Sequence, residues 1–164
     1  MERTLGCGKC ALKSETRFQE IFLLDTSVII DAINGKRGCH QLLNELLAQR
    51  NLLACCPINV TEVYAGMRPH EATLTEAFLR SLKSYEVTWN IARRAGDFKN
   101  EWAKKGQTIA LPEITIAAVA LANGLILVTG NREDFPMPEL QLQPLPDTVS
   151  QQPSPSTRRS PIAE

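Results

Sequence analysis

The sequence predicts an α/β fold, a three-layer α/β/α sandwich built around a central, mostly parallel sheet. Short apolar runs without polar alternation, at residues 21–24, 52–56 and 125–128, are typical of strands that are buried on both faces. Segments with apolar residues at helical spacing separate these runs, and strands that alternate with helices favour parallel pairing. The connections in such sheets are almost always right-handed, so we expect the carboxyl ends of the strands to gather at one edge.

The elements follow in order along the chain. After the strand at 21–24 we expect a helix from Thr26 to about Asn34, capped by Thr26 or Ser27 and ended by Gly35 and Gly38. The remaining predicted helices cover residues 39–50, about 57–67, 71–83, 91–105 and 112–122. The remaining predicted strands cover residues 52–56, 85–87, 125–128 and 140–142, the last as an edge strand.

Composition divides the chain into three parts. Residues 1–20 are polar and without clear period, which predicts a flexible N-terminal extension. Residues 21–146 carry the periodic segments and form the predicted domain. Residues 147–164 are rich in Pro, Ser, Gln and Arg, a composition that cannot build a core, so a disordered C-terminal tail is expected.

Charge and hydropathy exclude several classes of protein. Lys and Arg number 18 and Asp and Glu also number 18, so bulk attraction to nucleic acid is excluded and an anionic substrate must be held locally. The apolar runs are far shorter than the ~20 residues that cross a bilayer, and the chain opens without a signal-type leader. We therefore expect a soluble cytoplasmic protein with no membrane partner.

The five cysteines are an odd set, and Cys55 and Cys56 are adjacent in an apolar run. This pattern is typical of reduced, partly buried thiols rather than of a disulfide framework. Cys7 and Cys10 have the spacing of half a zinc site, but the sequence holds no second such pair, which favours a mobile extension over a zinc site.

Acidic residues follow the predicted strands. Asp25 comes directly after the first buried run, where ligands of open α/β sheets bind, although a lone aspartate there is also a common helix cap. Glu62 shares a helix face with small and apolar residues, although most glutamates are simply solvated. Glu113 opens an almost wholly apolar helix, where it would also complement the helix dipole.

A polar group, Thr129 to Asp134, follows the strand at 125–128, and its Gly, Asn and Asp residues would also suit a plain turn. Together these patterns place Asp25, Glu62, Glu113 and Asn131 or Asp134 at one edge of the sheet. Carboxylates crowded into one cleft repel each other unless a cation neutralises them. Oxygen ligands without His or Cys select Mg²⁺ or Mn²⁺, and such ions activate water for displacement at phosphorus.

Three blocks of sequence carry a family resemblance: LDTSVIIDA at 24–32, NVTEVYAG at 59–66, and LPEITIAA continuing to NGLILVTGNREDF over 111–135. With these blocks in this order and spacing, the chain resembles PIN domains, and specifically the VapC-type toxin ribonucleases, over residues 21–146. The resemblance implies a metal-dependent endoribonuclease that hydrolyses RNA with an activated water, is neutralised by a small antitoxin protein, and forms a homodimer.

The resemblance also implies a site. Asp25 and Glu62 match the first two acids of the family, and the last acidic position maps to Asp134 or Asn131. Thr129 matches a supporting hydroxyl that holds the first aspartate or a water. Glu113 departs from the usual aspartate by one carbon–carbon bond, about 1.5 Å of reach. The helix retreats, or the acid acts through water, or metal binding is weaker; the sequence leaves these alternatives open.

Basic residues are candidate contacts for RNA phosphates, although each is equally typical of a solvated helix face: Arg93, Arg94, Lys99, Lys104, Lys105 and Arg132. Trp89 and Trp102 are candidates for base stacking, with Trp102 more typical of a core position. The alternatives to a ribonuclease are a catalytically weakened PIN fold that only binds RNA or antitoxin, an interaction protein that dimerises through apolar helix faces, and a phosphatase or DNA nuclease that uses the same acids.

Overall fold

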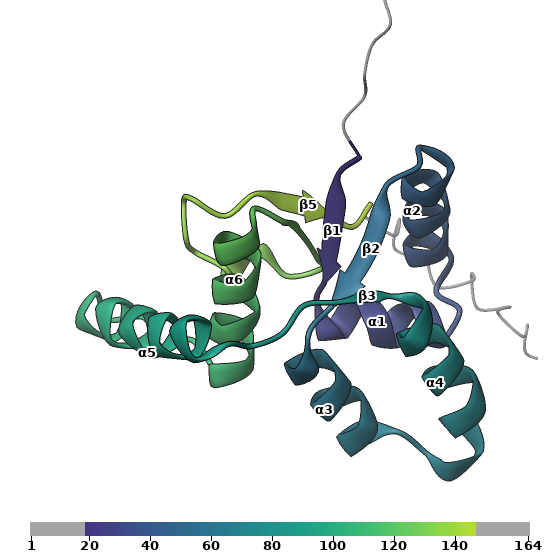
Figure 1. Cartoon of the computed structure of the whole chain (residues 1–164), viewed down its shortest axis with the longest axis horizontal. Coiled ribbons are helices and arrows are strands. Elements are labelled where there is room, and N and C mark those ends of the chain that lie inside the picture. Colours follow the sequence, from purple (N-terminus) through teal and green to yellow (C-terminus); the bar gives the residue numbers. More distant parts are fainter. Residues whose placement is uncertain (1–18, 147–164) are drawn as a thin grey trace, which may run out of the picture.

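A five-stranded parallel sheet forms the centre of the protein in a computed structural model, which describes residues 19–146 (Figure 1). The strand order is β3-β2-β1-β4-β5, and every neighbouring pair is parallel. The strands are β1 (Ile21–Leu24), β2 (Leu52–Cys55), β3 (Lys83–Ser84), β4 (Ile126–Thr129) and β5 (Leu142–Pro144). The predicted α/β class with a parallel central sheet is therefore confirmed.

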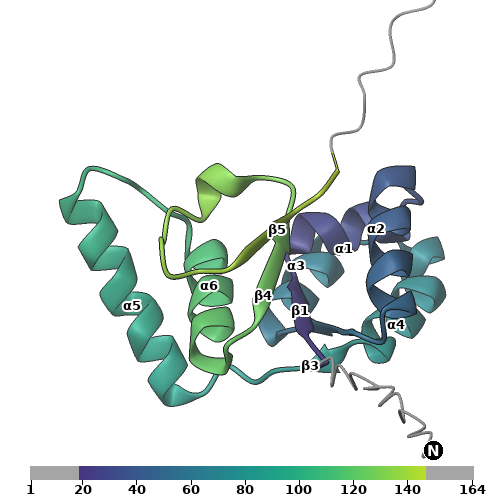
Figure 2. The ribbon, with the colours of Figure 1, turned by 90° about the horizontal axis from the view of Figure 1, so that it is seen from above.

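Helices cover both faces of this sheet (Figure 2). Within residues 19–146 they are α1 (Thr26–Ile33), α2 (Arg37–Ala48), α3 (Pro57–Gly66), α4 (Ala72–Ser81), α5 (Trp89–Lys104) and α6 (Leu111–Asn123), with short 3₁₀ turns η1 (Pro69–Glu71) and η2 (Arg132–Asp134). The helices α5 and α6 pack together on one side, α1, α2 and α4 lie on the other, and α3 contacts both α1 and α6. The three layers are those expected from the sequence.

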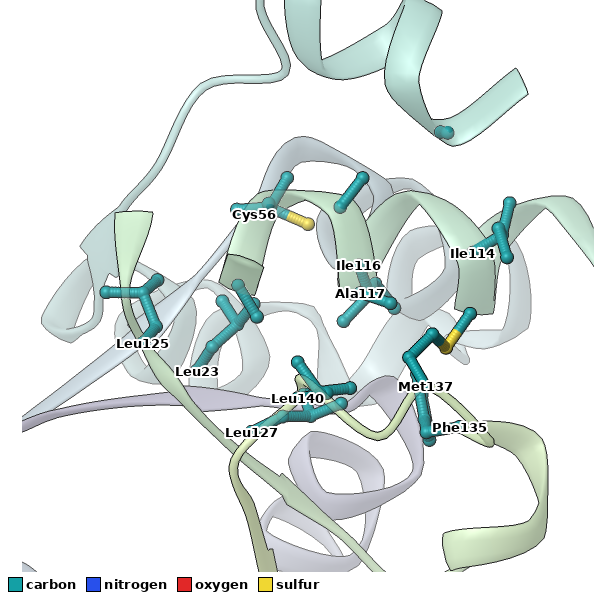
Figure 3. Close-up of a cluster of buried hydrophobic side chains, with 14 of the residues drawn as sticks. Leu23, Cys56, Ile114, Ile116, Ala117, Leu125, Leu127, Phe135, Met137 and Leu140 are labelled. Carbon is teal, nitrogen blue, oxygen red and sulfur yellow. The ribbon is translucent and has the colours of Figure 1, made fainter. Parts of the chain in front are cut away.

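Two apolar clusters on opposite faces of the sheet explain why the strands lack polar alternation. Leu23 and Leu127 point into the cluster under α5 and α6, which Figure 3 shows together with Ile116 and Phe135. The alternate side chains, such as Leu24, point into the cluster under α1, α2 and α4. Because successive side chains of a strand face opposite ways, a strand covered on both sides must be apolar at every position.

Some local predictions are wrong. The N-cap of α1 is Asp25, whose carboxylate accepts from the backbone N–H of Thr26, so Thr26 and Ser27 are not the caps. Gly35 ends the first helical segment in a left-handed conformation with φ of 72°, but Gly38 lies inside α2. A residue in the left-handed region breaks a helix, whereas glycine in itself only weakens one.

The third strand is also shifted from its predicted position at 85–87. It is Lys83–Ser84, because β2 offers pairing partners only up to Cys55. Tyr85 and Val87 lie just beyond it and pack against the core as partly buried side chains. The edge strand begins at Leu142 and runs to Pro144, so it shares one residue with the predicted 140–142. The apolar pattern marks burial, and the partner strand decides where pairing ends.

The thiols of Cys39, Cys55 and Cys56 are free and buried. Burial raises the pKa of Cys39 and of Cys55 to about 11, and it also raises the pKa of Cys56. This agrees with the prediction of reduced, buried thiols. Cys7 and Cys10 lie outside the described residues. Across residues 19–146, the helices lack the length and apolar content needed to span a bilayer.

The raised pKa values predict unreactive thiols in the folded protein. The thiolate is the reactive form, and a pKa of about 11 leaves about one thousandth of a thiol ionised at pH 8. In the variant Cys7→Ser/Cys10→Ser, iodoacetamide at pH 8 should leave Cys39 and Cys55 unlabelled by mass spectrometry. The same variant in urea is the control and should be labelled at all three remaining cysteines. Rapid labelling of the native form would contradict the burial described here.

Candidate metal and catalytic site

The strand order places the candidate site at the carboxyl edge of the sheet. From β1 the chain builds β2 and β3 on one side, and then crosses back to form β4 on the other side of β1. Ligands of open α/β sheets bind where the order reverses in this way, beyond the carboxyl ends of the strands. Leu24, the last residue of β1, pairs with Val128, the residue before the last of β4, so the residues at the carboxyl ends of both strands meet at this crevice.

Asp25 is fixed at this edge by its backbone and its side chain. Its N–H donates to the carbonyl of Val128 at 2.9 Å, which extends the pairing of β1 with β4 by one residue. Its carboxylate accepts from the N–H of Thr26 at 2.7 Å, from Ser27 Oγ at 2.7 Å and from Thr129 Oγ1 at 3.1 Å. The carboxylate of Asp25, a residue only 8% exposed, is therefore held in one orientation by three donors.

Glu62 reaches the same edge from α3. The hydroxyl of Thr26 donates to Glu62 Oε2 at 2.5 Å, while the N–H of Thr26 holds Asp25. One residue therefore links the two acids, although Asp25 follows β1 and Glu62 lies in α3. The two carboxylates come from different elements and approach each other because α3 packs against α1.

Glu113 and Asp134 line a second part of the edge, a hollow of about 390 Å³ whose other walls are residues 107–110 and Glu133. Glu113 lies in the first turn of α6, and its Oε2 atom is buried. Among the side-chain oxygen and nitrogen atoms that are buried in residues 19–146, it is the one that has no hydrogen-bond partner. A buried polar atom without a partner lowers the free energy of unfolding by about 1–3 kcal/mol. This oxygen is therefore a candidate ligand for a bound cation.

Thr129 and Asn131 organise the turn after β4. Thr129 Oγ1 accepts from the N–H of Asn131 at 3.0 Å, and its own proton is shared between Asp25 and the Asn131 carbonyl. The side chain of Asn131 donates to Asp134 Oδ2 at 2.8 Å and accepts from the N–H of Glu133. Asn131 thus orients Asp134, which lines the hollow together with Glu133 of the same turn.

The four predicted acids therefore form two pairs: Asp25 with Glu62 through Thr26, and Glu113 with Asp134 around the hollow. Within residues 19–146, no three His, Cys, Asp or Glu side chains already form a metal-binding cluster. From the sequence we predicted Thr26 and Ser27 only as helix caps, and we did not predict a role for Asn59, which donates to Thr26. The position of Thr26 and Ser27 directly after Asp25, at the end of β1, was the sequence signal for their contacts with the acids.

Several candidate RNA contacts are engaged within the protein. Lys99 donates to the carbonyl of Ile109 at 2.7 Å, Arg94 lies over the ring of Phe98 and near Glu101, and Lys105 lies over the ring of Trp102. Trp102 is partly buried against the core, as its spacing indicated, whereas Trp89 is 84% exposed. Arg132 is exposed and lies in η2, two positions before Asp134 in the chain, and it lines a separate hollow together with Phe135 and Met137.

Comparison with known proteins identifies the class. The PIN domain model matches residues 22–136, and the chain belongs to the PIN domain family. The sequence is 32% identical to ribonuclease VapC19 of Mycobacterium tuberculosis, over 73% of this chain and 96% of that protein. It is 31% identical to ribonuclease VapC2 of Haemophilus influenzae, over 70% of this chain and 89% of that protein. Within the family, the chain is of the VapC type, which confirms the resemblance seen in the sequence.

Solved structures agree with this assignment. VapBC2 from Rickettsia felis, bound to a DNA fragment from its promoter, superposes with a TM-score of 0.69 and 27% identity, covering 77% of this chain and 99% of that one. A toxin–antitoxin complex from Klebsiella pneumoniae superposes with a TM-score of 0.61 and 28% identity, covering 72% of this chain and 93% of that one. The parallel sheet and its flanking helices are therefore the fold of these toxins.

The partnerless oxygen of Glu113 predicts a gain in stability when the acid is removed. Glu113→Met should raise the free energy of unfolding by about 1 kcal/mol in EDTA, because it replaces a buried, unsatisfied carboxylate oxygen with an apolar group. Urea denaturation measures the change. The control is Glu101→Met on an exposed position of α5, expected within about 0.5 kcal/mol of the wild type. A Glu113→Met variant less stable than the control would contradict this account.

Proposed function

We propose that this protein is a metal-dependent endoribonuclease and the toxin of a toxin–antitoxin pair. The observation that carries the proposal is the acidic edge of the sheet, where a buried, triply hydrogen-bonded Asp25 is joined to Glu62 and where Glu113 holds a buried oxygen without a partner. The relatives at 31–32% identity are named ribonucleases, which supports RNA as the substrate.

The donor set fits Mg²⁺ or Mn²⁺. The side chains at the edge are carboxylates and hydroxyls, the hard oxygen ligands that these ions prefer. Asp25, Glu62, Glu113 and Asp134 are the residues that would hold the ion, and the partnerless Glu113 oxygen has the free lone pairs that a ligand needs. When bound, the ion would supply activation of a water and neutralisation of phosphate charge.

The protein side chains have separate tasks in this proposal. Thr26, Ser27 and Thr129 keep the Asp25 carboxylate in one orientation, so that little reorganisation is needed during reaction. Arg132, which is exposed and directly follows Asn131 in the chain, would contact the phosphate backbone in this proposal. Hydrolysis adds a water oxygen to phosphorus and releases the 3′ oxygen of the preceding ribose. The crevice between β1 and β4 would receive the scissile phosphate.

We also infer a protein partner. The solved relatives from Rickettsia felis and Klebsiella pneumoniae are toxin–antitoxin complexes, which supports a cognate antitoxin for this chain. We also propose a homodimer, because the family resemblance of the sequence implies one. A cytoplasmic location is proposed because the adjacent thiols of Cys55 and Cys56 are free and buried, as in proteins of reducing compartments.

The proposed function predicts that the charge of Asp25 is essential. Asp25→Asn keeps the shape of the side chain but removes its charge, and should lower magnesium-dependent cleavage of structured RNA by at least about a hundredfold. The matched control is Asp31→Asn in α1, the helix that Asp25 caps, where Asp31 pairs with Lys36 at 2.6 Å. The control should cleave at the wild-type rate in a gel assay of purified protein.

Two outcomes would overturn the enzymatic part of the proposal. Equal cleavage by wild type and Asp25→Asn would show that the activity does not use this site. Absence of cleavage by the wild type, together with retained binding of RNA or of an antitoxin, would favour the weakened binding module instead. Cleavage that persists in EDTA would contradict the dependence on a divalent ion.

A further inference from the structure

Asn59 is a fully buried amide between two backbone segments, and the proposed function leaves it without a role. Its exposed fraction is 0%. Its Oδ1 accepts from the backbone N–H of Cys56 at 2.8 Å and from Cys56 Sγ at 3.1 Å, and its Nδ2 donates to Thr26 Oγ1 at 3.0 Å. A buried amide with its oxygen and its nitrogen both engaged has one defined orientation.

The contact with Cys56 fixes which end of the amide faces Thr26. A backbone N–H can only donate, so the atom of Asn59 beside it must be the oxygen. The NH₂ group therefore faces Thr26, and the hydroxyl oxygen of Thr26 accepts from it. Cys56 directly follows β2 and precedes the first turn of α3, so this orientation is anchored to the end of a central strand.

The orientation of the amide in turn decides where the Thr26 proton points. A hydroxyl has one proton, and the Thr26 oxygen already accepts from Asn59. Its proton is directed to Glu62 Oε2, only 2.5 Å away. The chain of contacts therefore runs in one direction, from the backbone of Cys56 through Asn59 and Thr26 to Glu62.

We propose that Asn59 is a positioning residue for the metal site, acting through the hydroxyl of Thr26 to hold Glu62 in the orientation that binds a divalent ion. This inference rests on the proposed function. The side chain of Asn59 hydrogen-bonds to Cys56 and Thr26 and not to Asp25, and Asn59 does not line the hollow around Glu113. Residues that orient a metal ligand in this way are typically worth about 10–100-fold in metal affinity.

The competing explanation is that Asn59 only caps the start of α3. A cap lowers stability when it is removed, and it would change metal affinity by the same factor whether or not Thr26 carries a hydroxyl. A relay changes metal affinity only while the Thr26 hydroxyl is present. The two roles therefore differ in how the effects of Asn59 and Thr26 combine.

The test measures Mn²⁺ binding to the full chain by calorimetry. Thr26→Val, which removes the hydroxyl at nearly constant shape, and Asn59→Leu, which removes the amide, should each weaken binding about tenfold. Thr26→Ser restores the hydroxyl and should bind within about threefold of the wild type. The control Asn44→Leu changes an exposed asparagine of α2 and should bind within about twofold.

The double variant Thr26→Val/Asn59→Leu decides between the explanations. A relay predicts a loss of about tenfold, as in each single variant, whereas independent effects would multiply to about a hundredfold. Multiplied losses, or wild-type affinity in Thr26→Val, would overturn the inference. If Asn59→Leu does not fold, Thr26→Val and Thr26→Ser still test the relay, because both leave Asn59 and its contact with Cys56 in place.

A second readout separates this inference from the proposed function. If the wild type binds no Mn²⁺, the proposed metal dependence fails. Crystal structures of the wild type and of Thr26→Val then test the positioning by itself. A Glu62 side chain with one conformation in the wild type and several in Thr26→Val would support the relay, and an equally ordered Glu62 in both would overturn it.

Discussion

The pairing of β1 with β4 is the constraint on which the site depends. The hydrogen bond from the Asp25 N–H to the Val128 carbonyl extends this pairing past the last apolar residue of β1. It places a carboxylate where the sheet ends and next to Thr129, whose hydroxyl then reaches it. The apolar clusters on the two faces of the sheet hold β1 and β4 in this register. The position of Asp25 is therefore set by the packing of apolar side chains that take no part in the chemistry.

The acidic edge shows a conflict between stability and function. Asp25 is satisfied by three donors, so it costs little to keep. Glu113 is different, because one of its oxygens is buried without a partner among the described residues. An apolar helix such as α6 gains nothing from that atom, and functional sites are where proteins keep such unfavourable groups. Glu113 and Asp134 line the same hollow at this edge.

Much of the architecture follows from local sequence. Uninterrupted apolar runs identified β1, β2 and β4, and helical spacing located the helices to within a few residues. The third strand was misplaced because Tyr85 and Val87 are partly buried by packing against the core, while the residues paired with β2 are Lys83 and Ser84; beyond them, only the Tyr85 N–H still donates to Cys55 of β2. The cap of α1 was misassigned for a related reason: Asp25, Thr26 and Ser27 are all good caps, and the end of the strand decides which of them precedes the helix.

The sequence by itself determined which acids follow the strands, and its three blocks of motif were enough to indicate the family. Only the tertiary structure decided how those acids are held. Thr26 meets Glu62 across 36 positions and Thr129 meets Asp25 across 104, and no local pattern encodes such contacts. The direction of the Thr26 proton depends on Asn59, whose orientation depends on the backbone of Cys56. A hydrogen bond between distant residues exists only after packing has brought its donor and acceptor together.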